Sequence, residues 1–358
     1  MTSVLFITRK WPPAVGGMET YSAELVTALR KMGHDVELIH LPGSESGDAP
    51  RPFAILLFGL RTVLRLLWRR GDWAVVHGGD LAVWPLVWLA MRRSAARPFL
   101  TAHGTDVSFA FGSGFRRRLY HAYLGLGRRW LPSLTILANS RATSAKLGQL
   151  GFAGAEPIPL GCRVIADVRA EDPATLLFAG RLVERKGLSW FVDEVLPNLP
   201  DGLRLAVAGT IWDASESSAL ADPRVDDLGP LPQRELWARM GSALAVVIPN
   251  RHSGSHQFEG FGLIAAEAAA SGGLVLASDL DGYRDSVIDG KTGRLLPPED
   301  AKAWISAITA LARQSPEDRA AQRRTAQAVA VAQFDWSRVA RDTVAVYERS
   351  AADPPPTS

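Results

Sequence analysis

The chain has 358 residues, 47% of them hydrophobic, which predicts a globular protein of two ordinary domains. No apolar run is long enough to cross a bilayer, and the single cysteine, Cys162, excludes an intramolecular disulfide and a cysteine-rich metal site. The net charge of +3 hides an asymmetry, because residues 1–165 carry 20 Lys and Arg against 10 Asp and Glu, while the rest carry 20 against 27. The basic first half predicts an anionic partner there: an acidic lipid surface, a phosphorylated acceptor or nucleic acid.

Apolar runs that resemble strands alternate with helical patterns along the whole chain, which predicts the α/β class with parallel sheets. In the first half we expect strands at 4–7, 36–40, 74–77, 99–102 and 134–138, and a helix over 18–32. In the second half we expect strands at 176–179, 203–208, 244–248 and 274–277, after a linker over 165–173. Two such series predict two Rossmann-like domains facing a cleft, with ligand sites beyond the carboxyl ends of the strands.

The first candidate site is the loop after the first strand, where Gly16 and Gly17 precede a helix. Adjacent glycines let backbone amides approach an anionic or sugar ligand at a helix N-terminus. The alternative is a simple turn and helix cap. The loop lacks the Gly-x-Gly-x-x-Gly pattern, and His40 stands where an acidic residue would close the second strand, so a nicotinamide cofactor is disfavoured.

The second candidate is His103, which directly follows a strand in the segment His103-Gly-Thr-Asp106. A histidine at a strand end can reach a ligand and hydrogen-bond a sugar hydroxyl, although a lone histidine is often structural. We place Asp106 with it as a candidate acceptor contact.

The third candidate is the segment 180–187, where Gly180 ends a strand and Arg181 and Lys186 follow in a short loop. Two fixed cations near a helix start suit a diphosphate leaving group, on which negative charge builds up as it departs. Arg185 is expected to be the solvated cation of the three, and a wholly solvated loop is the alternative for all of them.

The fourth candidate is the segment 259–267, in which Glu259 and Glu267 flank the stretch Gly260-Phe261-Gly262-Leu263. A helix beginning near Leu263 would direct unpaired N–H groups toward a diphosphate. The alternative is an ordinary helix start with a glutamate on either side, which the helix dipole alone would favour.

These segments, in this order, resemble the retaining glycosyltransferases of family 4, which have the two-domain GT-B fold. The resemblance covers nearly the whole chain and rests on Gly16-Gly17, His103, Ala138-Asn139-Ser140, Gly180-Arg181, Lys186-Gly187, Glu259 to Glu267, Ala277-Ser278-Asp279 and Asp289-Gly290-Lys291-Thr292-Gly293. It implies an acceptor-binding domain over 1–165, a nucleotide-sugar domain over 166–333, and the return of the C-terminal helix to the first domain. The residues themselves predict that helix over 334–350 and, from the three prolines, a disordered tail over 351–358.

The resemblance also implies roles. The residues that match the family's diphosphate ligands are Arg181 and Lys186, Glu259 matches the contact to the donor sugar, and Glu267 matches the contact to the ribose. The amides around Phe261, Gly262 and Leu263 would join the donor contacts, with Gly16, Gly17 and Gly180.

Two segments depart from the family pattern, 281–285 (Asp-Gly-Tyr-Arg-Asp) and 161–163 (Gly-Cys-Arg), which leaves the sugar and acceptor preference open. Asp279-Leu280-Asp281 spells the metal motif of other glycosyltransferases, but Arg181 and Lys186 can fill that role, so we expect no metal and no cofactor. Retention is implied by the family. No carboxylate stands out as a nucleophile, which favours a front-face reaction.

Residues 52–70 predict a helix that carries Arg61, Arg65 and Arg69 at four-residue spacing beside Phe, Leu and Trp. This composition is typical of an interfacial helix on anionic lipid, and the alternative is a sheet-covering helix with a solvated arginine stripe. The first reading predicts a lipid or lipid-linked acceptor, with Arg61 and Arg65 as acceptor contacts. The protein would then be cytoplasmic, at the inner face of the membrane.

The leading hypothesis is therefore sugar transfer from a UDP- or GDP-sugar. The alternatives are a GT-B nucleotide-sugar epimerase or hydrolase, and a non-catalytic protein that binds sugar nucleotides. Nucleic-acid binding is disfavoured, because only the charge supports it.

Overall fold

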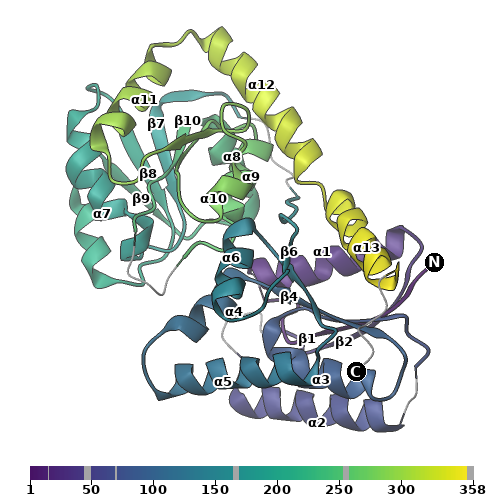
Figure 1. The fold of residues 1–358 in the computed structure, drawn as a ribbon. Helices are drawn as coiled ribbons and strands as arrows, with labels where there is room; N and C mark the ends of the chain where they lie inside the picture. The colour runs from purple at the N-terminus through teal and green to yellow at the C-terminus, as the bar shows by residue number, and fades with distance from the viewer. Residues whose placement is uncertain (15, 44–49, 69–70, 164–168, 253–257, 353–358) are drawn as a thin grey trace. The chain divides into compact units, whose positions relative to one another are not determined.

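The computed structural model describes residues 1–14, 16–43, 50–68, 71–163, 169–252 and 258–352. The chain forms two compact units: unit 1 is Met1–Gly161 with Trp336–Ser358, and unit 2 is Cys162–Asp335 (Figure 1). Part of the segment expected as a linker, 165–168, and most of the expected tail, 353–358, lie outside the described residues.

Unit 1 contains a parallel sheet of six strands in the order β2-β1-β3-β4-β5-β6. Their bounds are β1 Ser3–Thr8, β2 Asp35–His40, β3 Val75–Gly78, β4 Arg97–Ala102, β5 Thr135–Ala138 and β6 Glu156–Pro157. The first five lie within two residues of the predicted ends. Their inner positions are almost all buried, as expected for a parallel sheet covered on both faces.

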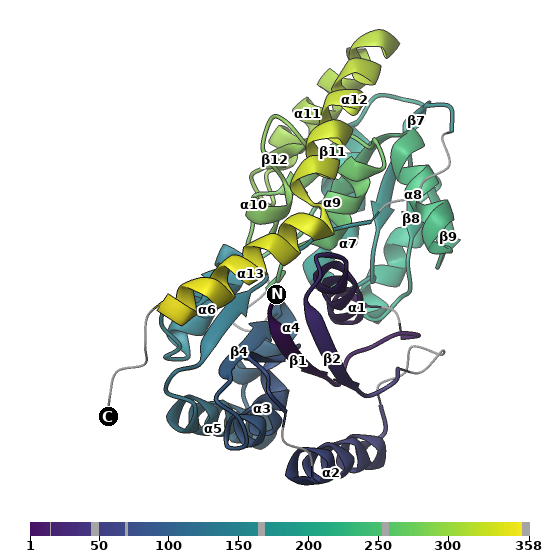
Figure 2. The ribbon, with the colours of Figure 1, turned by 90° about the vertical axis from the view of Figure 1, so that its right-hand side faces the viewer.

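The helices of unit 1 cover both faces of this sheet. Their bounds are α1 Gly17–Lys31, α2 Pro52–Trp68, α3 Trp84–Met91, α4 Gly104–Ser108, α5 Phe115–Trp130, α6 Arg141–Gln149 and α13 Trp336–Ala352. Figures 1 and 2 show α1 and α13 side by side on one face, and α2, α3 and α5 on the other.

The last helix, α13, is fixed to the sheet of unit 1 by a buried polar chain. The Tyr347 hydroxyl lies 2.5 Å from His77 Nδ1, and His77 Nε2 lies 2.7 Å from the Thr101 hydroxyl, which also contacts the Tyr21 hydroxyl at 2.6 Å. Burial lowers the pKa of His77 to about 3, so its ring is neutral at physiological pH. The helix runs through Ala352, two residues beyond the predicted end.

Unit 2 contains a second parallel sheet of six strands, in the order β12-β11-β10-β7-β8-β9. The strands are β7 Asp172–Ala179, β8 Arg204–Ala208, β9 Val225–Gly229, β10 Ala243–Ile248, β11 Val275–Ser278 and β12 Arg294–Leu296. The main helices are α7 Leu188–Trp190, α8 Gln233–Ser242, α9 Leu263–Ala270, α10 Tyr283–Ser286, α11 Ala301–Arg313 and α12 Pro316–Gln333. The buried side chains of Trp304 and Phe191 pack edge to face in its core.

The strands that the sequence did not predict are β6, β9 and β12, and all three are edge strands. β6 and β12 span two and three residues, and β9 has the polar sequence Val-Asp-Asp-Leu-Gly. Short or polar edge strands have no apolar run that would mark them in a sequence.

Candidate active site

The glycine segment of unit 2 opens helix α9, as expected. Gly262 is the residue before the helix and has a φ of +80°, a left-handed conformation that favours glycine. A Cβ atom there would lie 2.4 Å from the ring of Tyr283. The loop also lies against Gly282, where a Cβ atom would meet the Phe261 Cα at 2.5 Å. Two glycines therefore allow this close backbone packing at the helix N-terminus.

Glu259 lies in the same loop, and two cations hold its side chain. Its Oε2 accepts a hydrogen bond from Lys186 Nζ at 2.7 Å and one from Arg185 Nη1 at 3.1 Å. Burial alone would raise the pKa of Glu259, but Lys186 and Arg185 outweigh it and lower the pKa to about 2. The group is therefore a permanent carboxylate, and the cluster of Arg185, Lys186 and Glu259 carries a net charge of +1.

Arg185 corrects the sequence interpretation, which made it the solvated member of the three cations. Its side chain is 13% exposed and contacts Glu259, whereas Arg181 is the exposed one. The Arg181 guanidinium lies over the ring of Trp212, 4.7 Å from its centroid. Two arginines of one loop therefore have different partners, Glu259 for Arg185 and Trp212 for Arg181.

The structure brings two further residues to this cluster that the sequence did not predict. The Tyr283 hydroxyl accepts a hydrogen bond from Lys186 Nζ at 3.0 Å and lies 3.2 Å from Asn250 Oδ1. Tyr283 belongs to the segment 281–285, which departs from the family pattern. That departure is the feature of the sequence that could have pointed to Tyr283. Asn250 follows the end of β10 and is almost completely buried.

Glu267 lies in the second turn of α9. Burial raises the pKa of Glu267 to about 7, and the side chains of Gln233 and Trp237 oppose the shift. Glu267 is therefore about half ionised near neutral pH, unlike Glu259.

The two aspartates of the metal-like motif each bind within the protein. Asp279 accepts a hydrogen bond from Arg284 Nε at 2.6 Å, and Asp281 Oδ2 accepts one from the Glu259 backbone N–H at 3.2 Å. Over the described ranges, no three His, Cys, Asp or Glu side chains are grouped so that they could hold a metal ion.

In unit 1 the glycine loop leads into α1, with Gly16 before the helix and Gly17 its first residue. A Cβ atom on Gly16 would lie 2.5 Å from Glu19 Oε2, whereas one on Gly17 would meet no atom within 4 Å. The Glu19 carboxylate is the end of a flexible side chain and can move aside, so crowding requires glycine at neither position.

His103 also lies in unit 1 and is buried at the end of β4. Its Nε2 donates to the Gly79 carbonyl oxygen at 3.1 Å, and its ring packs edge to face on Tyr21. Burial lowers the pKa of His103 to about 4, so the ring is neutral. A neutral ring with Nε2 protonated has Nδ1 as its acceptor.

The Asp106 side chain is occupied by hydrogen bonds within the protein, one of them to the loop that contains His103. Its Oδ1 accepts the His103 N–H at 2.7 Å, its Oδ2 accepts the Leu81 N–H at 3.2 Å, and the residue is buried. Burial and the neighbouring Asp80 raise the pKa of Asp106 to about 8. A direct acceptor contact was expected, and the observed contacts join the loops after β3 and β4.

Arg61 and Arg65 lie on α2, where they line a cavity of about 430 Å³ between that helix and the end of β2. Its walls include His40, Leu57 and Phe58. Arg65 Nη2 also bonds Glu37 Oε1 on β2 at 2.8 Å. Arg69, the third arginine of the predicted stripe, lies outside the described residues.

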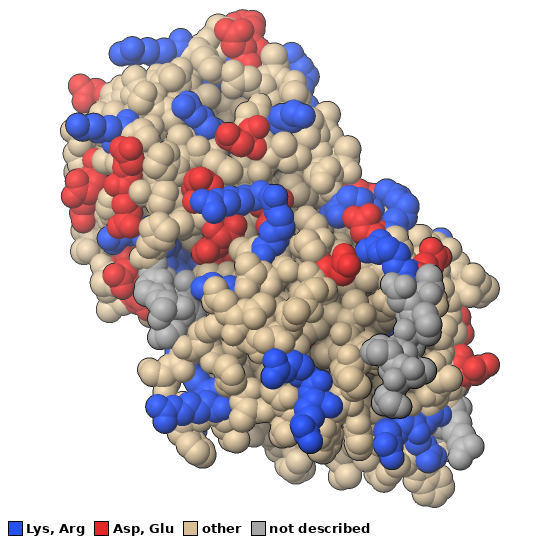
Figure 3. Space-filling view, viewed as in Figure 1, with Lys and Arg blue, Asp and Glu red and all other residues tan. Residues whose placement is uncertain are grey.

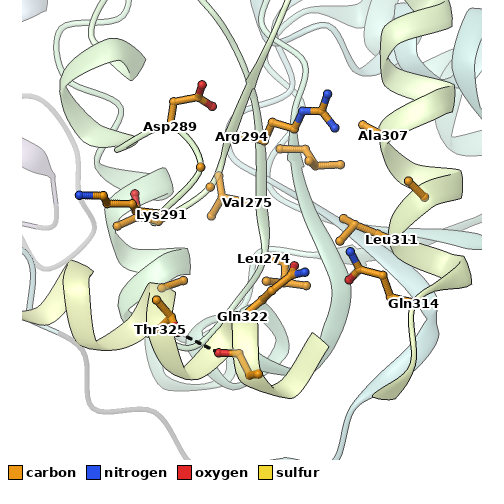
Figure 4. A pocket seen from close by; sticks show the side chains of 17 residues that line it. Leu274, Val275, Asp289, Lys291, Arg294, Ala307, Leu311, Gln314, Gln322 and Thr325 are labelled. Atoms are coloured by element: carbon orange, nitrogen blue, oxygen red, sulfur yellow. Dashed lines mark hydrogen bonds between the residues drawn. The ribbon is translucent and has the colours of Figure 1, made fainter. Parts of the chain in front are cut away.

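A larger cavity of about 590 Å³ lies elsewhere in unit 2, at the amino ends of β11 and β12 (Figure 4). Leu274, Val275 and Leu311 line it together with the amides of Gln314 and Gln322. Glu259 and Lys186 instead follow the carboxyl ends of their strands. None of the predicted site residues lines this cavity, and we assign it no part in the site.

Comparison with known proteins gives a glycosyltransferase family model for each half of the chain. Residues 15–162 match the family model "Glycosyltransferase Family 4", and residues 173–314 match "Glycosyl transferases group 1". Phosphatidyl-myo-inositol mannosyltransferase of Mycobacterium leprae is 36% identical, over 94% of this chain and 94% of that protein. Glycogen synthase of Mycobacterium tuberculosis is 29% identical, over 96% and 94%.

Solved structures show the same architecture. The Anabaena protein HepE, in complex with UDP and glucose, aligns with a TM-score of 0.71 and 15% identity, over 98% of this chain and 100% of that chain. The two parallel six-stranded sheets, the matching family models and the relative at 36% identity agree. The chain belongs to the family 4 glycosyltransferases and has the GT-B fold.

Proposed function

We propose that this glycosyltransferase moves a sugar from a UDP- or GDP-sugar to a lipid or lipid-linked acceptor, with retention of the anomeric configuration and without a metal. The observation that carries the donor half is the cluster of Lys186, Arg185 and Glu259 beside the N-terminus of α9. Two largely buried cations and a helix N-terminus together suit a diphosphate. HepE, solved with UDP and glucose, supports this donor class.

The proposal assigns each donor contact to a group of unit 2. Lys186, with Arg185 and Arg181, binds the diphosphate together with the amides around Phe261, Gly262 and Leu263. Within the described part of the chain, Glu259 Oε2 bonds both cations and Oε1 has no hydrogen-bond partner. That free oxygen accepts a hydroxyl of the donor sugar. Glu267 accepts hydrogen bonds from the ribose hydroxyls. Gly180, at a φ of +145°, forms the turn before Arg181 without a side chain that could block the ligand.

The reaction in this proposal is a front-face substitution. The bond from the anomeric carbon to the phosphate oxygen breaks, the bond to the acceptor oxygen forms on the same face, and the departing phosphate oxygen takes the acceptor proton. Glu259 does not act as nucleophile or base, because two cations hold it and its pKa of about 2 makes it a weak base. The cations stabilise the charge that develops on the diphosphate. For unit 1 taken by itself, the proposal is that the His103 ring binds a sugar hydroxyl and that the amides of Gly16 and Gly17 bind an anionic or sugar group.

The acceptor half of the proposal rests on the surface of α2. Six of its apolar side chains are between 45% and 89% exposed: Phe53, Leu56, Leu60, Leu64, Leu67 and Trp68. They form one stripe along the helix, opposite the buried stripe of Phe58, Thr62 and Leu66, and Arg61 and Arg65 lie along its flank. An outward apolar stripe with flanking arginines suits an anionic bilayer surface better than water.

Charge on the rest of unit 1 agrees with a lipid surface. Figure 3 shows Lys and Arg prevailing on the visible face of unit 1, whereas both signs are mixed on unit 2. Helix α5 adds Arg116, Arg117, Arg118, Arg128 and Arg129. Among the described residues, no helix is long and apolar enough to span a membrane. We infer contact with an anionic leaflet through α2, and with it a place at the inner face of the cell membrane.

The test of the function is an assay of UDP- and GDP-sugars with phosphatidylinositol vesicles or maltooligosaccharides as acceptors. The choice of these acceptors is suggested by the names of two relatives, a phosphatidyl-myo-inositol mannosyltransferase and a glycogen synthase. We expect a glycosylated product with the donor's anomeric configuration. Consumption of the donor without acceptor would instead identify a hydrolase or epimerase, and nucleotide binding without turnover would identify a binding protein. Equal, negligible sedimentation with anionic and neutral liposomes would refute the membrane contact.

A further inference from the structure

The Tyr283 hydroxyl is the second fixed acceptor of the Lys186 ammonium. Lys186 Nζ donates to Glu259 Oε2 at 2.7 Å and to the Tyr283 oxygen at 3.0 Å. The phenolic proton then points toward Asn250 Oδ1, at 3.2 Å, or toward Glu259 Oε2, at 3.5 Å. Tyr283 is fully buried and its pKa is raised well above the usual value by burial, so the hydroxyl keeps its proton.

The ring of Tyr283 is fixed independently of its hydroxyl. It lies under Gly262, where an added Cβ atom would approach it to 2.4 Å, and Lys186 Nζ lies 5.6 Å from its centroid. Tyr283 is the first residue of α10, and the residue before it, Gly282, donates its N–H to the Glu259 carbonyl oxygen at 3.0 Å. This hydrogen bond holds the start of α10 against the Glu259 loop. The hydroxyl therefore has one position relative to the loop that opens α9.

An ammonium group has three N–H donors in a tetrahedral arrangement. Two of them are directed by Glu259 and Tyr283, so the direction of the third is determined. We propose that Tyr283 is a positioning residue that directs this third N–H of Lys186 at the diphosphate of the donor. The inference rests on the proposed donor site and goes beyond it, since the sequence pattern assigned no role to residue 283.

The consequence is specific to phosphate. Without the hydroxyl, Lys186 keeps Glu259 as its one fixed acceptor among the described residues and can turn, so its N–H no longer points at one place. Binding of the nucleoside part does not depend on Lys186 and stays the same. A role of Tyr283 in folding alone would weaken nucleoside and nucleotide binding together.

The test compares wild-type protein with Tyr283→Phe, which keeps the ring and removes the hydroxyl. Calorimetric titration uses UDP or GDP, whichever raises the wild-type melting temperature, and the nucleoside of the same base. We expect about tenfold weaker diphosphate binding and unchanged nucleoside binding, the size of one lost charge-assisted hydrogen bond. In kinetics the donor KM rises more than kcat falls. Tyr347→Phe, the same change at a buried tyrosine of unit 1, is the matched control and should leave diphosphate binding unchanged.

A double-mutant cycle with Lys186→Met completes the test. If Tyr283 acts through Lys186, Tyr283→Phe has no further effect on diphosphate binding in the Lys186→Met background. Asn250→Ala, which removes the acceptor of the hydroxyl, is a second variant and should show a smaller loss in the same direction. Unchanged diphosphate binding in Tyr283→Phe, or an equal loss for nucleoside and diphosphate, overturns the inference. Failure of the wild-type protein to bind either diphosphate would instead refute the proposed donor site.

Discussion

The Lys186 ammonium and the Glu259 carboxylate meet at 2.7 Å, joining the loop after β7 to the loop that opens α9. The two residues are 73 positions apart in the chain. Arg185 adds a second cation to the same oxygen, so one carboxylate balances two cations and leaves a positive charge at the helix N-terminus. An anion at this place gains from both the cations and the helix dipole.

Replacing Glu259 by Gln keeps the size of the side chain and removes its charge. We expect kcat/KM for the donor sugar to fall about 100-fold, because the hydroxyl contact and the placement of Lys186 both weaken. Steady-state kinetics with a defined donor measure this. Glu194→Gln, at an exposed position of unit 2, is the control and should change the rate less than twofold. Wild-type rates in Glu259→Gln would refute the role of this carboxylate.

Glu267 makes the stability of the protein depend on pH near neutrality. Its folded pKa of about 7 lies above the ordinary value of 4.5, so between these values the folded protein holds a proton that the unfolded chain has lost. The free energy of unfolding therefore falls as pH rises from 4.5 to 7, by up to about 3 kcal/mol, and stays reduced above pH 7. Glu267→Gln cannot ionise at this position and should lack this pH dependence of the free energy of unfolding.

Thermal unfolding of the wild-type protein and Glu267→Gln at pH 5, 6, 7 and 8 checks this dependence. We expect the melting temperature of the variant, relative to wild type, to increase from pH 5 to pH 7 and to level off between pH 7 and pH 8. A difference that is the same at all four values would show that Glu267 is ionised normally in the folded protein.

Gly262→Ala tests the close packing at the start of α9. A non-glycine residue at a φ of +80° costs about 1–2 kcal/mol, and the added methyl group meets the Tyr283 ring. We expect a lower melting temperature and weaker binding of a nucleoside diphosphate. Gly59→Ala in the middle of α2, where a Cβ atom meets nothing within 4 Å, is the control and should stabilise the protein by about 0.5–1 kcal/mol. Retained stability and binding in Gly262→Ala would contradict this account of the loop.

The hydroxyl of Tyr347 should contribute to the attachment of α13. Tyr347→Phe leaves His77 Nδ1 buried without its partner, which costs about 1–3 kcal/mol. We expect a lower melting temperature, measured by calorimetry, and the combination with Thr101→Val should be less than additive, because both changes break one chain of hydrogen bonds. Strict additivity would show that the two contacts are energetically independent.

Polar substitutions in the exposed apolar stripe of α2 should weaken membrane binding without destabilising the fold. Leu60→Gln with Leu64→Gln should weaken sedimentation with anionic liposomes about tenfold, since about 1.5 kcal/mol of apolar burial in the interface is lost. Both side chains are about half exposed, so the melting temperature should hardly change. Val331→Gln, an equally exposed apolar position of unit 2, is the control. Unchanged binding of the double variant would exclude α2 as the contact surface.

The sequence predicted most of the fold because buried parallel strands appear as continuous apolar runs. Val4 to Ile7 and Leu244 to Ile248 are two examples, and both are almost completely buried. The edge strand β9 has two aspartates in five residues and shows no such run. Strand β9 forms by pairing with β8, and the residues of β9 alone do not predict that pairing.

The site was predicted less fully, because side-chain direction in a loop depends on contacts made far away in the chain. Of the two arginines in the loop after β7, only the structure shows that Arg185 contacts Glu259 while Arg181 lies on Trp212. Tyr283 reaches Lys186 from 97 positions away. Motifs identified the loops, and the packing of those loops determined which side chains meet.

The most direct test of the donor site is calorimetric titration of the wild-type protein and Lys186→Met with UDP and with GDP. We predict that one of the two diphosphates binds the wild-type protein and that Lys186→Met weakens its binding about 100-fold, as expected for the loss of a buried cation that contacts phosphate. Lys302→Met, at an exposed position of α11, should bind as wild type does. Equal affinities of Lys186→Met and wild type for that diphosphate would contradict the account.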